Sequence, residues 1–266
     1  MIGYPAVFFV EWVQRLRGLA GPEVIGVLLR GSHARGTATA YSDVDFDVLV
    51  GGPPYANYPA YLIEMDGRLT HVSVAIRDAA SWLDRLERPA TWSYGFPVAT
   101  AARLLWAHAH WLGRLDLSVI EHPAGGPELE DLVADLGKVA AAALAGDEMG
   151  LRLAAADLAR LCPSVLRLVN EPVTVACRRE ALEAALSLPV APPTYRIDMA
   201  TCLGLDPRRA AEVAEVAAAA SRLVAGTLAL VRPCADELVD AVGPDFAAAL
   251  TDGRLSRYVG QLAAVL

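Results

Sequence analysis

The chain has 266 residues, an apolar share of 55% and a formal net charge of −8, which allows one large domain or two modest ones and excludes a disordered protein. The acidic balance argues against a protein that coats nucleic acid, because such affinity rests on lysine and arginine side chains that neutralise phosphates. The sequence contains no uncharged run of about 18 apolar residues, which is the length that would predict a membrane span. The four cysteines lack metal-ligand spacing, and Glu11, Arg15 and Arg17 interrupt the first apolar stretch, so we expect a cytoplasmic protein without a signal peptide.

The first half of the chain alternates short apolar runs with glycine and proline turns, which predicts a mixed sheet with flanking helices. Helices are expected over residues 5–20 and 78–88, where apolar side chains recur at helical spacing. Asp66-Gly67 predicts a hairpin turn. Strands are expected over residues 23–30, 43–50, 60–66, 68–76 and 103–106.

Alanine and leucine dominate the second half, with charges at helical intervals, which predicts an all-helical region. Helices are expected over residues 128–146, 150–169, 174–188, 194–204, 207–231 and, in pieces, 244–266. Pro163 should kink or split the second of these helices, and Asp206-Pro207 should begin the fifth. The glycine- and proline-rich segment 122–127 reads as a linker. We therefore predict an α+β chain, with a mixed sheet in residues 1–122 and a helical domain in residues 127–266.

The segment between the first two strands has the composition of a phosphate-binding turn. A strand leads into Gly31-Ser32 and then into a short helical segment; glycine lets the backbone approach a phosphate, and serine can donate a further hydrogen bond. Ten residues later, Asp43 and Asp45 stand two apart on a strand, so both carboxylates project from one face. Mg²⁺ takes one or two protein carboxylates and completes its shell with phosphate oxygens and water.

Gly31-Ser32, ten residues and Asp43-x-Asp45 resemble the motif of the nucleotidyltransferase superfamily that includes polymerase β. The wording Gly-Ser-x-Ala-Arg-Gly resembles the minimal and aminoglycoside-modifying branches, and the layout is similar to kanamycin and streptomycin nucleotidyltransferases. The resemblance implies that Asp43 and Asp45 bind Mg²⁺ and that Gly31 and Ser32 hold the triphosphate of ATP or another nucleoside triphosphate. Arg35 and Arg30 flank the turn and are further candidates for phosphate contacts.

The family's third carboxylate is missing from the expected strand 68–76, where Ser73 stands in the acid's place. Three readings stay open: Asp47 reaches the site, although an acid there is more readily a floor residue paired with an arginine; His71 serves as the base; or the centre is degenerate and only binds nucleotide. Glu64 and Asp66 are weaker candidates, because acids beside an Asp-Gly turn usually face water.

The expected function is transfer of a nucleoside monophosphate from a nucleoside triphosphate to a small-molecule acceptor, with release of pyrophosphate. ATP is the favoured donor, so AMP is the favoured transferred group. Asp43, Asp45 and His71 are the expected catalytic residues, and the substrate cleft is expected between the two domains. An aminoglycoside hydroxyl is the acceptor by analogy of layout, and a carboxylate acceptor of secondary metabolism is the variant that needs no general base. A non-catalytic nucleotide-binding or regulatory protein is the alternative. Neither nucleic acid nor a membrane is an expected partner.

Overall fold

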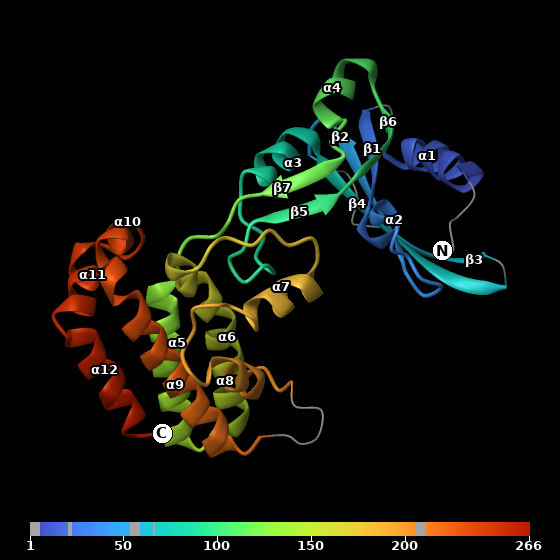
Figure 1. Cartoon of the computed structure of the whole chain (residues 1–266). Coiled ribbons are helices and arrows are strands. Elements are labelled where there is room, and N and C mark those ends of the chain that lie inside the picture. Colours follow the sequence, from blue (N-terminus) through green and yellow to red (C-terminus); the bar gives the residue numbers. More distant parts are fainter. Residues whose placement is uncertain (1–5, 21–22, 54–58, 66, 206–210) are drawn as a thin grey trace. The chain divides into compact units, whose positions relative to one another are not determined.

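The computed structural model describes the chain except for residues 1–5, 21–22, 54–58, 66 and 206–210 (Figure 1). The chain divides into two compact units. Unit 1 comprises Met1–Pro89 and Val98–Pro123, and unit 2 comprises Ala90–Pro97 and Ala124–Leu266. Unit 1 is built on a mixed sheet and unit 2 on helices, so the α+β fold expected from the sequence is confirmed.

A five-stranded sheet in the order β3-β4-β2-β1-β6 forms the centre of unit 1. β2 and β4 are parallel, and the other neighbouring strands are antiparallel. A separate two-stranded sheet is made by β5 and β7. The strands are β1 (Val24–Arg30), β2 (Val44–Val50), β3 (Ala60–Met65), β4 (Arg68–Asp78), β5 (Val98–Ala101), β6 (Arg103–Ala107) and β7 (Val119–His122).

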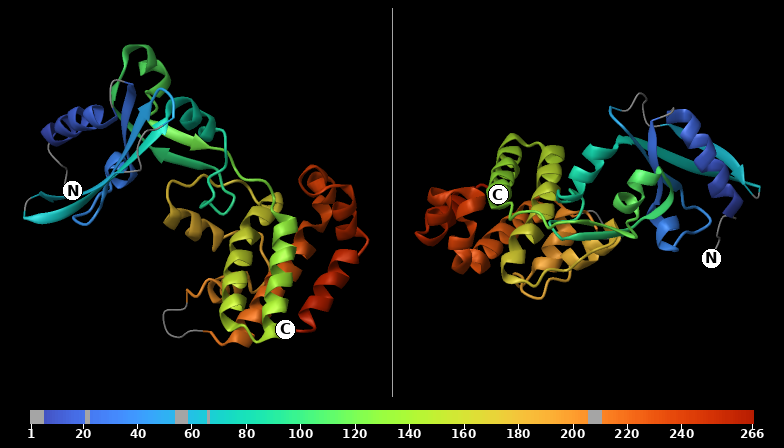
Figure 2. Two further views of the ribbon diagram at one scale, coloured as in Figure 1. Left: turned by 180° about the vertical axis from the view of Figure 1, so that it is seen from behind. Right: turned by 90° about the horizontal axis from the view of Figure 1, so that it is seen from above.

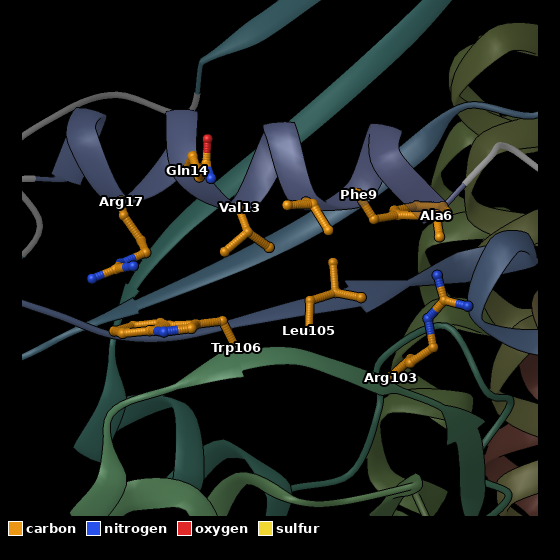
Figure 3. Close-up of a pocket in the computed structure, with 9 residues that line it drawn as sticks. Ala6, Phe9, Val13, Gln14, Arg17, Arg103, Leu105 and Trp106 are labelled. Atoms are coloured by element: carbon orange, nitrogen blue, oxygen red, sulfur yellow. The ribbon is translucent and has the colours of Figure 1, made fainter.

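Helix α1 (Ala6–Ala20) covers one face of the sheet. Trp12 stacks on Phe46 of β2 with ring centroids 5.7 Å apart, and both side chains are at least 95% buried. At the edge of the sheet, α1 and β6 border an open cleft of about 600 Å³ in which Arg17 lies over the ring of Trp106 (Figure 3). Phe46 alternates with Asp45 and Asp47 along β2, so the aspartates face away from α1.

The opposite face of the sheet is covered in part by α3 (Ala79–Leu86) and by the β5–β7 pair (Figure 2). Its core includes Leu28, Leu49, Trp82 and Ile120, each at most 3% exposed. Asp78 caps α3 by accepting a hydrogen bond from the backbone N–H of Ser81 at 2.8 Å. α4 (Leu112–Leu115) follows β6 and a short 3₁₀ turn, η1 (Ala109–Trp111).

Unit 2 is a bundle in which α5 packs along α6 and both pack against α9. Its α-helices are α5 (Leu129–Ala145), α6 (Glu148–Leu166), α7 (Arg178–Ala185), α8 (Tyr195–Cys202), α9 (Val213–Val231), α10 (Val239–Val242), α11 (Pro244–Thr251) and α12 (Arg254–Ala263). The 3₁₀ turns are η2 (Arg167–Val169) and η3 (Arg232–Leu238). Among the described helices, the run Val213–Val242 is the one long and apolar enough to cross a membrane. Of the apolar 18-residue stretch within it, 44% is buried inside the protein.

The fold differs from the sequence predictions at three places. Of the kink or split expected at Pro163, the split does not occur, because α6 continues to Leu166 with the proline in its last turns. α9 begins at Val213 rather than near residue 207, and a capping box between Glu212 and Glu215 fixes that start; Asp206-Pro207 lies outside the described residues. The short strands β5 and β7 were not expected, because four-residue strands carry too little periodicity to be recognised.

Candidate active site

The site begins where β1 runs into a five-residue helix, α2 (Gly31–Arg35). Arg30 at the end of β1 lies opposite Asp45 of β2 in the antiparallel pair. Gly31 has a φ of +68°, and a Cβ atom at this position would lie 2.5 Å from Oδ2 of Asp45. Glycine is therefore required here on two counts: the left-handed backbone and the close approach of a carboxylate.

The parallel pairing of β2 and β4 brings the next residues to the same place. Asp45 lies directly beside Ser73, and Val44 beside Val72. One residue earlier, Nδ1 of His71 is 4.0 Å from Oδ2 of Asp43, and both side chains are about half exposed, at 49% and 54%. The structure thus gathers Asp43, Asp45 and His71 at one end of the sheet, beside the turn at Gly31.

Asp45 is the carboxylate most affected by its surroundings. Burial raises its pKa above the ordinary value, and the neighbouring charges of Asp43 and Asp47 raise it further. Arg30 and His71 oppose this shift only in part. A half-buried carboxylate crowded by other carboxylates is stabilised when a cation binds beside it.

Asp47 is a floor residue, that is, a buried acid beneath the site that is paired with an arginine, as the sequence suggested. It is 6% exposed and accepts hydrogen bonds from Nη1 of Arg30 at 2.8 Å and from Nε1 of Trp82 at 3.2 Å. Arg77 forms a further ion pair, with Nε 3.6 Å from Oδ1 of Asp47. These contacts occupy the carboxylate, so Asp47 does not replace the missing third acid.

The arginines around the turn differ in whether another described residue binds their side chains. Arg30 is anchored to Asp47, and its buried Nε has no hydrogen-bond partner among the described residues. Arg35 is half-buried and makes no hydrogen bond or ion pair with another residue that the structure describes. The same holds for the hydroxyl of Ser32 within the described ranges, although its backbone carbonyl accepts a hydrogen bond from Thr37. Ser32 and Arg35 are therefore available to a ligand.

Sequence reasoning did not single out His33 and Arg103 at this end of the sheet. Burial lowers the pKa of His33, and the positive charge of Arg103 lowers it further, whereas a hydrogen bond that the imidazole donates to the backbone of Ser42 and the charge of Asp43 raise it. Arg103 begins β6, and only the strand order places it near α2. No local signal in the sequence could have shown that proximity.

Of the weaker candidates Glu64 and Asp66, Glu64 does not join the site. Glu64 lies opposite Leu69 in the β3–β4 hairpin and is exposed, as expected beside a hairpin turn, and Asp66 lies outside the described residues. Gly67 has a φ of +73°, which agrees with the Asp-Gly hairpin signal.

The donor set fits Mg²⁺. In the part of the chain that the structure describes, no three histidine, cysteine or acidic side chains gather as a ready metal site. Two carboxylates of which one is half-buried and electrostatically strained, next to an open backbone turn, suit a cation that takes its remaining ligands from phosphate and water.

The chain matches two family models of nucleotidyltransferases. A family model described as "Nucleotidyltransferase domain" matches residues 11–89, and one described as "Nucleotidyltransferase, substrate binding domain" matches residues 128–233. Among solved structures, the chain is similar to a nucleotidyltransferase-like protein from Exiguobacterium sibiricum 255-15, at 12% identity and a TM-score of 0.38, over 85% of this chain and 73% of that one. The comparison with curated proteins gave no match. The resemblance inferred from Gly31-Ser32 and Asp43-x-Asp45 is thus confirmed, and the chain belongs to the nucleotidyltransferase superfamily.

Proposed function

We propose that the protein transfers AMP from ATP to a small-molecule acceptor, with Mg²⁺ held by Asp43 and Asp45 and with release of pyrophosphate. The observation that carries the proposal is the approach of Gly31 to Asp45. A backbone turn without a Cβ atom lies directly against a half-buried carboxylate whose pKa is raised. A triphosphate entering at this turn would meet the two carboxylates that share its metal ion.

The side chains around the turn have separate roles in the proposal. Ser32 donates a hydrogen bond to a phosphate oxygen, and Arg35 pairs with the outer phosphates through its uncommitted guanidinium. Arg30 is a positioning residue, because it holds Asp47 and offsets part of the negative charge at Asp45. When bound, Mg²⁺ polarises the α-phosphate and stabilises charge on the departing pyrophosphate.

A carboxylate acceptor is the second candidate, and the position of Ser73 favours it. Ser73 stands beside Asp45 where a third acid would activate a hydroxyl. A carboxylate is already ionised and needs no such base. With a hydroxyl acceptor, His71 is the group in position to take the proton, since it lies beside Asp43.

Pyrophosphate release decides between the candidates. The full chain would be supplied with each nucleoside triphosphate and Mg²⁺ across a panel of hydroxyl and carboxylate acceptors, including aminoglycosides because of the similar layout. Acceptor-dependent release with ATP supports transfer. Binding of ATP and Mg²⁺ without release for any acceptor would assign a nucleotide-binding role instead.

We place the reaction in the cytoplasm, because the four cysteines are unpaired thiols and two of them are buried.

A further inference from the structure

Unit 2 contains a cleft of about 1010 Å³ whose walls all belong to that unit. It is bordered by the segment 91–95, by α5 and α6, and by α7. Most of it falls inside residues 128–233, which match the substrate-binding domain. The charges that line it are of both signs: carboxylates outnumber cations on the wall made by α5 and α6, and two arginines lie on the wall made by α7.

The wall made by α5 and α6 is predominantly acidic. Its carboxylates are Glu128, Asp131, Asp135 and Asp157, and its cations are Lys138 and Arg160. Lys138 donates to Asp135 at 2.6 Å, and Arg160 donates to Asp157 at 2.8 Å. Asp131 makes no hydrogen bond or ion pair within the described ranges, and it acts on Lys138 through its charge alone, so its carboxylate has room for a further cationic group.

The wall made by α7 is basic. Arg178 and Arg179 line the cleft there, and Nε of Arg179 donates to Glu183 at 2.7 Å. Arg178 is exposed and forms no ion pair with any residue that the structure describes. This wall therefore presents an uncommitted guanidinium to an anionic group.

Aromatic side chains close a third side of the cleft. Trp92 and Tyr94 come from a tightly held segment: Phe96 and Ser93 are fully buried, and Arg167 donates to the carbonyl of Gly95. Tyr94 is the one non-glycine residue with positive φ in the described chain, at +55°. A segment fixed in this way presents its aromatic rings without much loss of conformational entropy on binding.

We propose that this cleft binds the acceptor and that the acceptor is an ampholyte, a small ring-bearing molecule with both an ammonium and a carboxylate group. The ammonium faces Asp131, the carboxylate pairs with Arg178, and the ring lies against Trp92 and Tyr94. An acceptor with cationic groups alone would be repelled by the α7 wall. The assignment of the ligand as an acceptor rests on the proposed nucleotidyl transfer, whereas the binding itself does not.

Lys138 provides a reporter inside the cleft. It is the single lysine of the chain, which otherwise carries arginines. The hydrogen bond to Asp135 raises the pKa of Lys138, and the charge of Asp131 acts in the same direction. An amine-acylating reagent then marks Lys138 and the α-amino group, and peptide mass separates the two. A ligand in the cleft should protect Lys138 and leave the α-amino group unprotected.

The test uses the full chain without nucleotide and three matched probes: L-phenylalanine, L-phenylalaninamide and N-acetyl-L-phenylalanine. These carry both charges, the positive charge alone and the negative charge alone. We expect L-phenylalanine to protect Lys138 at about tenfold lower concentration than either analogue. Asp131→Asn should abolish that advantage over N-acetyl-L-phenylalanine, and Arg178→Gln should abolish it over L-phenylalaninamide.

Glu130→Gln and Arg196→Gln are the matched controls, because both residues are exposed in unit 2 and neither lines the cleft. Both should protect like the wild type. Equal protection by the three probes, protection by none, or stronger protection by kanamycin, which carries only positive charge, would overturn the proposal. The outcome is separable from the proposed function: protection in a protein that binds no ATP leaves the cleft standing, and pyrophosphate release with acceptors that never protect Lys138 refutes the cleft alone.

Discussion

Gly31 and Asp45 lie so close that a Cβ atom on Gly31 would be 2.5 Å from Oδ2 of Asp45. Gly31→Ala should therefore displace the Asp45 carboxylate and remove most of the affinity for ATP and Mg²⁺, as measured by isothermal titration. Gly36→Ala is the matched control, since Gly36 has nearly the same φ, +71°, but no atom within 4 Å of the added Cβ. Both variants carry a backbone strain of about 1–2 kcal/mol. Equal affinity in the two variants would contradict the role of Gly31.

The carboxylate pair should matter for metal and not for the fold. The double change Asp43→Asn and Asp45→Asn is expected to abolish Mg²⁺-dependent ATP binding. The melting temperature should stay unchanged or rise slightly, because the negative charges of Asp43 and Asp47 act against that of Asp45. Asp84→Asn, at an exposed position on α3, is the control. Unchanged ATP affinity in the folded double variant would refute the assignment.

Asp47 should show the reverse pattern. Asp47→Ala leaves Arg30, Arg77 and Trp82 without their common acceptor in a buried position. We expect a loss of about 3 kcal/mol in the free energy of unfolding, because two arginines that are only 26% and 28% exposed lose their shared carboxylate. Urea denaturation measures it, with Asp43→Asn as the comparison, since Asp43 is half exposed. A loss below about 1 kcal/mol would show that the floor does not depend on Asp47.

Capping of α3 by Asp78 predicts a pH-dependent contribution to stability. Hydrogen bonds from the backbone and side chain of Ser81 lower the pKa of Asp78 below its ordinary value of 3.8. A lowered pKa in the folded state means that the contribution is complete above the unfolded value and is lost as the pH falls through the folded one. Asp78→Ala should therefore cost about 1 kcal/mol at pH 7 and progressively less below about pH 4. Asp84→Ala, which removes no cap, should show no such trend in melts across this range.

The elements that the sequence predicted are those with strong periodicity or strong turn residues. The helix over 5–20, the strand over 43–50 and the Asp-Gly hairpin match α1, β2 and the β3–β4 pair closely. The floor role of Asp47 also followed from its place among three acids on one strand. These features depend on local chemistry, which a sequence states directly.

Features set by distant contacts were not accessible in the same way. The segment 90–97 belongs to unit 2 although the sequence groups it with the sheet, because Arg167 and Val175 hydrogen-bond to Gly95 and Pro97. The proximity of Arg103 to His33 and the acidic and basic walls of the cleft likewise depend on which elements become neighbours. A pattern of residues along the chain does not encode those neighbours by itself.

The last prediction concerns the place of the missing acid. Because Ser73 lies beside Asp45 in the parallel pair, Ser73→Asp should put a third carboxylate next to the metal ligands. We expect tighter Mg²⁺ binding by the ATP complex, measured by titration, since each added carboxylate favours a hard cation. Ala75→Asp is the matched control, because Ala75 lies two residues further along β4 and beside Asp47 instead. If both variants tighten Mg²⁺ binding equally, the effect is one of net charge and not of position.

His71 then separates the two kinds of acceptor. A positioned base is worth about 10²–10⁴-fold when a neutral hydroxyl attacks, and nothing when the attacking group is a carboxylate. We expect His71→Ala to leave transfer nearly unchanged, because Ser73 leaves the site without the acid that hydroxyl attack requires. Single-turnover pyrophosphate release with the acceptor found in the panel measures this step, and ATP titration of the same variant checks that the nucleotide still binds. If the transfer rate instead falls 10²-fold or more while the ATP affinity is intact, His71 is the base for a hydroxyl acceptor. Because His71 lies 4.0 Å from Asp43, that hydroxyl would then lie beside the metal ligands.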